Sequence, residues 1–258
     1  MTETPDTRTR TGAAATQQYD AIGAQWENAR ELPTVYPERS SFRRLLGDVR
    51  GADVLDLACG DGFYTRQVRQ EGARRALGVD ISPAMVESAR AIEERAPLGV
   101  EYLVADAARP DLSELGGHDL VLAAYLVNYA KSEEELTDMC RGALSALAPG
   151  GRFVGVTQRP GFSFRGPRPD PYGFHFARQR ESELGTHIKV TAALRPPISF
   201  ETCLIRPEVY ERAFAAAGFG ELTWVEMTVG EEGERRYGTA FWEGFLANPP
   251  IVMFEARR

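Results

Sequence analysis

The chain has 258 residues, a formal net charge of −7 at pH 7 and 43% hydrophobic residues. A chain of this length buries roughly three quarters of the surface it exposes when unfolded, so one domain with a substantial core is expected. The acidic balance argues against nucleic acid as a partner, because phosphate binding requires clustered lysine and arginine.

The three cysteines and three histidines follow no spacing typical of a disulfide framework or a zinc site, so no metal is predicted. Residues 1–16 are polar, lack the apolar segment of a signal peptide and are expected to be a disordered tail. No run approaches the ~20 apolar residues of a membrane span. A cytoplasmic protein without a membrane partner is therefore expected, and its oligomeric state stays open.

In chain order, the first predicted elements are two amphipathic helices. Tyr19, Ile22 and Trp26 recur at helical spacing, and residues 42–49 form a second short amphipathic pattern. Residues 17–50 are therefore expected to form a helical cap on a single domain that covers residues 17–258.

Short apolar runs then alternate with helical segments at a regular interval. Helices are predicted at 63–70, from Ser82 onward and at 133–147, with Pro83 suited to the first helical position. The predicted strands are residues 54–58, 76–80, 100–104, 118–124 and 152–157. This alternation is typical of an α/β fold with a parallel sheet, and the nearly continuous apolar strands indicate helices on both faces.

The regular alternation stops at residue 158. Residues 159–171 are rich in Pro, Gly and Arg and predict an irregular loop, whereas residues 188–194 and 198–204 predict a hairpin. Residues 158–204 are therefore interpreted as an insertion that covers the site and contacts the substrate. The remaining predicted elements are a helix at 207–217, a strand at 222–229, a helix at 237–246 and a strand at 251–255.

A glycine-containing turn after the first strand, residues 56–62 (DLACGDG), is the first candidate for a ligand site. Glycines there allow a tight turn and a close approach of a ligand to the backbone. Asp80 ends the next strand, where a carboxylate can accept hydrogen bonds from both ribose hydroxyls of a nucleoside. A nucleoside-containing cofactor across two strand ends is therefore predicted.

The same turn distinguishes between cofactors. A dinucleotide fingerprint requires a third glycine, which is missing after Gly62, and Asp61 would place a negative charge beside a pyrophosphate. An NAD-type oxidoreductase is the rival interpretation. A cofactor with a positive charge and no phosphate fits better, and S-adenosylmethionine (SAM) is such a molecule.

Four segments together resemble the class I SAM-dependent methyltransferases. Residues 54–62 (VLDLACGDG) resemble motif I, residues 78–82 (GVDIS) motif II, residues 105–107 (ADA) the adenine-binding turn, and residues 147–151 (LAPGG) the turn before strand five. The resemblance covers about half of the chain. It implies a Rossmann-like, doubly wound sheet of seven strands, mostly parallel with an antiparallel last strand, and SAM as cofactor, with S-adenosylhomocysteine as its product.

Three further segments are similar to a subgroup that includes the toxoflavin N-methyltransferases, which methylate ring nitrogens of a small heterocycle. They are residues 19–22 (YDAI), 122–130 (LAAYLVNYA) and 248–252 (NPPIV).

The resemblance to the family also implies roles for particular residues. Asp56 would contact the methionine ammonium, Asp80 the ribose and Asp106 the adenine amino group. Each aspartate has a structural alternative as a cap or turn residue. The implied cofactor-binding residues are Tyr19, Arg30, Asp56, Ala58, Gly60, Gly62, Asp80, Ile81, Met85, Asp106, Ala107, Ala124 and Tyr125.

Methyl transfer from a sulfonium chiefly requires alignment, and a heteroaromatic nitrogen needs no general base. Tyr125, Asn128 and Tyr129 are predicted to position the substrate, while His175 and His187 are alternative bases. Further candidates for the pocket wall are Trp26, Tyr36 and Trp224.

The sequence thus predicts a SAM-dependent methyltransferase of secondary metabolism that acts on a small heteroaromatic acceptor, with N-methylation favoured. The alternatives are an O- or C-methyltransferase of a secondary metabolite and a non-catalytic SAM-binding protein.

Overall fold

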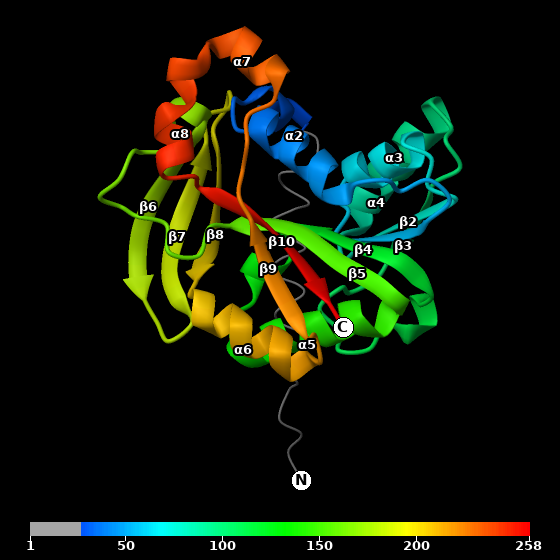
Figure 1. The fold of residues 1–258 in the computed structure, drawn as a ribbon. Coiled ribbons are helices and arrows are strands. Elements are labelled where there is room, and N and C mark those ends of the chain that lie inside the picture. The colour runs from blue at the N-terminus through cyan, green and yellow to red at the C-terminus, as the bar shows by residue number, and fades with distance from the viewer. Residues whose placement is uncertain (1–26) are drawn as a thin grey trace.

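The computed structural model describes residues 27–258, so Tyr19 and Trp26 lie outside the described residues. A seven-stranded sheet, here called sheet A, has the strand order β3-β2-β1-β4-β5-β10-β9 (Figure 1). Its strands are β1 (Asp53–Leu57), β2 (Arg75–Asp80), β3 (Glu101–Val104), β4 (His118–Ala124), β5 (Leu147–Gln158), β9 (Glu221–Val225) and β10 (Ile251–Arg257). β10 pairs antiparallel with both β5 and β9, and the pairs among β1–β5 are parallel. The predicted fold class is confirmed.

Helices cover both faces of sheet A. The α-helices are α2 (Val35–Leu46), α3 (Phe63–Gln70), α4 (Pro83–Arg95), α5 (Glu133–Ala146), α6 (Pro207–Ala217), α7 (Glu231–Tyr237) and α8 (Glu243–Ala247). Short 3-10 helices are η1 (Glu27–Glu31), η2 (Ser113–Leu115), η3 (Val127–Tyr129), η4 (Asp170–Tyr172) and η5 (Thr239–Trp242). Ser82 caps α4 as predicted, since its hydroxyl accepts a hydrogen bond from the Met85 N–H at 3.2 Å.

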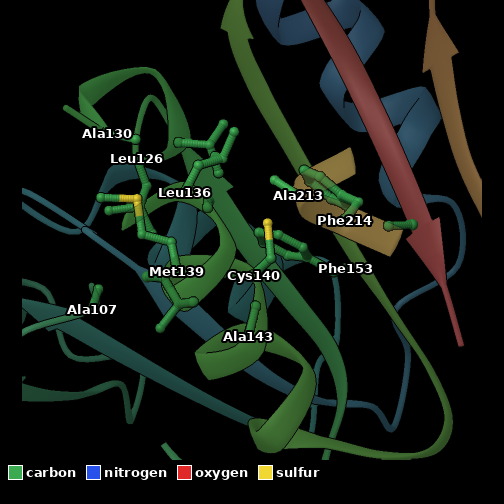
Figure 2. Close-up of a cluster of buried hydrophobic side chains, with 14 of the residues drawn as sticks. Ala107, Leu126, Ala130, Leu136, Met139, Cys140, Ala143, Phe153, Ala213 and Phe214 are labelled. Carbon is green, nitrogen blue, oxygen red and sulfur yellow. The ribbon is translucent and has the colours of Figure 1, made fainter. Parts of the chain in front are cut away.

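The core consists of two layers, one on each face of sheet A. Leu55 and Leu57 of β1 face α5 and α6, where Phe153 and Phe214 stack with ring centroids 6.0 Å apart (Figure 2). Val54 faces the opposite layer, formed with α2, α3 and α4. Because both faces are covered, the central strands are largely apolar, which is the pattern that the sequence displayed.

A second sheet of three antiparallel strands, here called sheet B, falls within the region that lacked regular alternation. It consists of β6 (Phe174–Glu181), β7 (Gly185–Ala192) and β8 (Ile198–Ile205). The predicted hairpin of β7 and β8 is confirmed, whereas β6 was not predicted. Only its first residues alternate clearly, because the later ones are exposed and polar along the sheet edge.

Several element boundaries differ from the prediction. The helix expected at 42–49 begins earlier, at Val35, and ends at Leu46. β5 begins at Leu147 and not at residue 152, and β9 ends at Val225 and not at residue 229. In place of the single helix expected at 237–246, α7 ends at Tyr237 and is followed by η5 and α8, because Gly238 has φ of +81° and interrupts the helical conformation. Within residues 27–258, no helix combines the length and apolar character that crossing a bilayer requires.

Candidate cofactor and acceptor site

The carboxyl ends of β1, β2 and β4 meet at one edge of sheet A. β1 pairs with β2 on one side and with β4 on the other, so the strand order reverses between β1 and β4. Open α/β sheets bind their ligands at such a switch point. The predicted cofactor residues on these three strands are therefore brought to one place.

The backbone leaves both central strands in a left-handed conformation. Ala58 after β1 has φ of +58° and Tyr125 after β4 has φ of +62°, although neither is glycine. This conformation costs a residue with a side chain roughly 1–2 kcal/mol, and such strain gathers at functional sites.

The two glycines of the turn after β1 have different surroundings. Gly60 has φ of +56°, and a Cβ added there would meet no atom of residues 27–258 within 4 Å. Gly62 precedes α3 with φ of +82°, and a Cβ there would lie 2.1 Å from the Tyr102 hydroxyl oxygen. Gly60 therefore borders open space, whereas a side chain at Gly62 would overlap with Tyr102.

Asp56 is almost completely buried at the end of β1, on the face covered by α3. Its Oδ2 accepts a hydrogen bond from the Thr65 hydroxyl at 2.6 Å, whereas its Oδ1 has no hydrogen-bond partner among the described residues. Burial raises the pKa of Asp56 to about 7, and the charges of Asp80 and Asp61 add to this effect. Such an acceptor suits a cationic hydrogen-bond donor, such as an ammonium group.

Asp80 connects the turn after β1 to the start of α4. Its Oδ2 accepts from the Gly60 N–H at 2.9 Å and its Oδ1 from the Ser82 N–H at 2.9 Å. Ser82, not Asp80, is the cap of α4. Each carboxylate oxygen accepts more than one hydrogen bond, so this geometry leaves Asp80 able to bind ribose hydroxyls as well.

The charge around the turn is negative. Burial raises the pKa of the Cys59 thiol well above its usual range, and the charges of Asp56, Asp80 and Asp61 add to this effect. Arg30, predicted to reach the methionine carboxylate, forms an ion pair with Asp61 and lies 4.7 Å from the centre of the Phe63 ring. Arg30 thus lies at the edge of the turn but is already paired there.

A groove of about 670 Å³ extends from this pair between α2, α3 and α7, and Tyr36 is among its lining residues. Trp224, the other described candidate for the pocket wall, instead packs in the core against Tyr210 and Phe254.

The predicted adenine residues follow β2 and β3. Asp106 is exposed after β3, and its Oδ1 accepts from the Ala108 N–H at 2.9 Å. This is the turn-aspartate contact that was the alternative to adenine binding. Ala107 and Met85 are buried and Ile81 is half-buried. Asp106 thus makes the turn contact in this structure, and its contact with adenine stays a prediction.

The acceptor residues follow β4. Asn128 in η3 is fully buried, and its Nδ2 donates to the Thr202 hydroxyl of β8 at 3.1 Å. The Thr202 hydroxyl in turn donates to the Asn128 carbonyl at 3.1 Å. Tyr129 is half-buried and packs against the apolar face of sheet B. Asn128 therefore connects sheet B to the end of β4, and Tyr129 lies at their junction.

The two faces of sheet B differ in character. One face presents the aromatic cluster, defined here as Phe162, Phe174, Phe176, Phe200 and Tyr129 with its aliphatic neighbours Ile188, Val190 and Leu204. His175 pairs with Thr191, and His187 with Cys203, so strand alternation places both histidines on the other face. The His175 Nδ1 lies 2.7 Å from Asp170, and the His187 Nε2 lies 2.9 Å from the Ser182 hydroxyl. Their geometry gives no support to a role as base.

Glu38 of α2 is a residue that the sequence analysis missed. Its carboxylate is buried and accepts hydrogen bonds from the hydroxyls of Tyr64, at 2.5 Å, and Tyr125, at 2.6 Å. Burial raises the pKa of Glu38. A lone glutamate within an amphipathic pattern resembles a surface residue, so no local signal could have identified it.

Among residues 27–258, no group of three or more His, Cys, Asp or Glu residues is arranged to hold a metal ion.

Comparison with known proteins identifies the class. Residues 54–151 match the family model of a methyltransferase domain. N-demethylindolmycin N-methyltransferase of Streptomyces griseus is 27% identical over 217 residues, which cover 79% of this chain and 83% of that protein. Ribosomal protein L11 methyltransferase of Burkholderia ambifaria is 37% identical over 104 residues, so the match spans 40% of this chain but only 31% of that protein.

Solved structures agree with the fold. A SAM-dependent methyltransferase from Mesorhizobium loti has a TM-score of 0.61 at 22% identity and covers 86% of this chain and 98% of its own. The DhpI–SAM–HEP complex has a TM-score of 0.63 at 20% identity and covers 99% of this chain and 100% of its own. Residues 54–151 therefore form a methyltransferase domain, and the chain is a methyltransferase.

Proposed function

We propose that the protein transfers a methyl group from SAM to a nitrogen atom of a small heteroaromatic acceptor, as a step of secondary metabolism. The observation that carries this proposal is the position of the aromatic cluster: Tyr129 packs on it directly after β4, four residues beyond Tyr125. Aromatic rings bind a flat heterocycle by stacking and edge-to-face contact.

The residues at the switch point fit SAM. The buried Asp56 Oδ1 would accept from the ammonium group, the open backbone at Ala58 and Gly60 would line the methionine part, and Asp80 would hold the ribose. The adenine would be surrounded by Asp106, Ala107, Ile81 and Met85. The sulfonium would lie beside Ala124 and Tyr125. Gly62 would contribute by allowing the turn after β1, and Arg30 by its ion pair with Asp61. The role of Tyr19 stays a prediction.

Bound SAM would supply a methyl group that a sulfonium already activates. The chain then has to align the acceptor and exclude water, and alignment alone contributes about 7–11 kcal/mol. Asn128 would act indirectly, because its side chain is buried on Thr202 and fixes sheet B against η3. No general base is part of this proposal, since an uncharged heteroaromatic nitrogen attacks without losing a proton first.

The finer assignment is to the subgroup of the toxoflavin N-methyltransferases. The N-demethylindolmycin N-methyltransferase relative supports small-molecule N-methylation. We further propose that residues 17–50 act as a cap and that residues 158–204, which contain sheet B, cover the acceptor.

The test incubates the purified protein with SAM and a panel of heteroaromatic amines, indoles, phenols and β-dicarbonyl compounds. Products and released S-adenosylhomocysteine are measured by mass spectrometry, and the methylated atom is assigned by NMR. We expect N-methyl products from the heteroaromatic nitrogen compounds. Methylation confined to oxygen or carbon would contradict the proposed acceptor, and SAM binding without any product would favour a non-catalytic role.

A further inference from the structure

Three side chains from separate elements meet around one buried carboxylate. Glu38 comes from α2, Tyr64 from α3 and Tyr125 from the end of β4. The Tyr64 hydroxyl donates a hydrogen bond to Glu38 Oε1 and the Tyr125 hydroxyl to Glu38 Oε2, so each carboxylate oxygen accepts one hydrogen bond from a phenol. Among the described residues, no lysine or arginine forms an ion pair with Glu38. Two phenols therefore supply the hydrogen bonds to a carboxylate that burial has removed from water.

A packing role alone does not account for this arrangement. Apolar side chains of similar volume often stabilise a core as well as a buried charged network does. The network instead ends on a residue with an unusual backbone. Tyr125 has φ of +62°, and its N–H donates to the Val156 carbonyl at 2.9 Å. β5 thus fixes the backbone of Tyr125, while α2 fixes its hydroxyl.

We propose that Glu38 is a positioning residue for methyl transfer, which holds the Tyr125 ring in one orientation at the end of β4. This inference rests on the proposed function, which places the sulfonium and the acceptor beside Tyr125. Glu38 does not touch the reacting atoms. It acts through Tyr125 and makes the alignment of the reaction depend on the docking of α2 against sheet A.

A double-mutant cycle tests this dependence. The variants are Glu38→Gln, Tyr125→Phe and the double variant, with Tyr64→Phe as the matched control. Gln keeps the size of Glu but offers one acceptor oxygen for two phenol protons. Tyr64→Phe removes the same kind of hydrogen bond from the other oxygen of the same carboxylate. Turnover is measured with an acceptor from the panel, and SAM affinity by calorimetry.

We expect Glu38→Gln and Tyr125→Phe each to lower kcat about 10- to 100-fold, because small misplacements of reacting groups have effects of this size. The Kd for SAM of Glu38→Gln should stay within threefold, because Glu38 itself does not contact the cofactor in this proposal. The double variant should be no slower than the slower single variant, since Glu38 acts only through Tyr125. Tyr64→Phe should stay within threefold of native kcat. Losses that multiply in the double variant, or a Tyr64→Phe enzyme as slow as Glu38→Gln, would overturn the proposal.

A second measurement requires no acceptor. The protein is labelled with 3-fluorotyrosine, and the ¹⁹F resonance of residue 125 is assigned by its loss in Tyr125→Phe. We expect this resonance to move both in Glu38→Gln and on addition of SAM. A resonance unchanged by Glu38→Gln would contradict the positioning role, whichever acceptor is used. A native protein that binds SAM but methylates nothing would instead contradict the proposed function.

Discussion

The Thr65 hydroxyl donates a hydrogen bond to Asp56 Oδ2 at 2.6 Å, which connects the first turn of α3 to the last residues of β1. The hydrogen bond satisfies only one oxygen of a carboxyl group that is almost fully buried, since Oδ1 has no partner among residues 27–258. The fold therefore maintains an acceptor that a ligand can complete, and free energy is lost while it stays unpaired.

In the cofactor-free protein, Asp56→Asn should raise the free energy of unfolding, by an amount that depends on pH. Because its pKa rises from 3.8 to about 7 on folding, the folded state binds the extra proton, and stability falls as pH rises between these values. Neutral Asn avoids this loss. We expect the variant to gain about 1–4 kcal/mol of unfolding free energy at pH 8 relative to native protein, and much less at pH 4, in urea titrations. An equal gain at both pH values would show that Asp56 is not shifted.

Asp80→Ala should weaken SAM binding. A charged acceptor contributes about 1.5–3 kcal/mol, which corresponds to a loss of roughly 10- to 150-fold in affinity. Calorimetric titration with SAM measures this loss of affinity. Asp138→Ala is the control, because Asp138 lies on α5 and pairs with Arg141 at 3.2 Å. Similar SAM affinity in both variants would refute the ribose role of Asp80.

Gly60→Ala and Gly62→Ala form a matched pair with opposite readouts. Both glycines have positive φ, so both substitutions should lower stability by about 1–2 kcal/mol. Gly62→Ala adds the overlap with Tyr102 and should lose about 2–4 kcal/mol in total. The Gly60 methyl group meets no protein atom and should act chiefly on SAM affinity. Thermal unfolding and SAM titration of both variants test this prediction. A larger loss of stability in Gly60→Ala than in Gly62→Ala, or a larger loss of SAM affinity in Gly62→Ala than in Gly60→Ala, would contradict it.

Phe176→Ala should raise the KM for the acceptor at least fivefold while leaving SAM affinity within twofold, because Phe176 belongs to the aromatic cluster and is distant in sequence from the cofactor motifs. His175→Ala and His187→Ala, on the opposite face of the same strands, are the controls. Each should retain kcat within tenfold. A loss of 10²-fold or more in either would reinstate that histidine as a base.

The parallel half of sheet A was predictable because its strands are buried on both faces and its turns contain the residues that such turns require. The positions of Asp56, Gly60 and Asp80 at or just after strand ends could be predicted for the same reason, while their roles in cofactor binding stay predictions. Glu38 could not, because its function depends on Tyr125, 87 residues away in the chain.

Sheet B shows a second limit of prediction. The orientation of His175 and His187 follows from the register of three strands, and the role of Asn128 follows from Thr202, 74 residues later. Neither relationship has a signature in local composition. Aromatic residues in β6 were visible in the sequence, but their common face with β7 and β8 was not.

The position of β10 has a consequence for how the chain is made. Residues 251–257 leave the ribosome after β5 and β9, yet they lie between those two strands and pair with both. Until then the nascent chain carries two open strand edges, with an apolar slot that Ile251, Val252, Met253 and Phe254 later occupy. A chain that lacks residues 251–257 would therefore leave the edge of β5 unpaired, and unpaired strand edges favour aggregation.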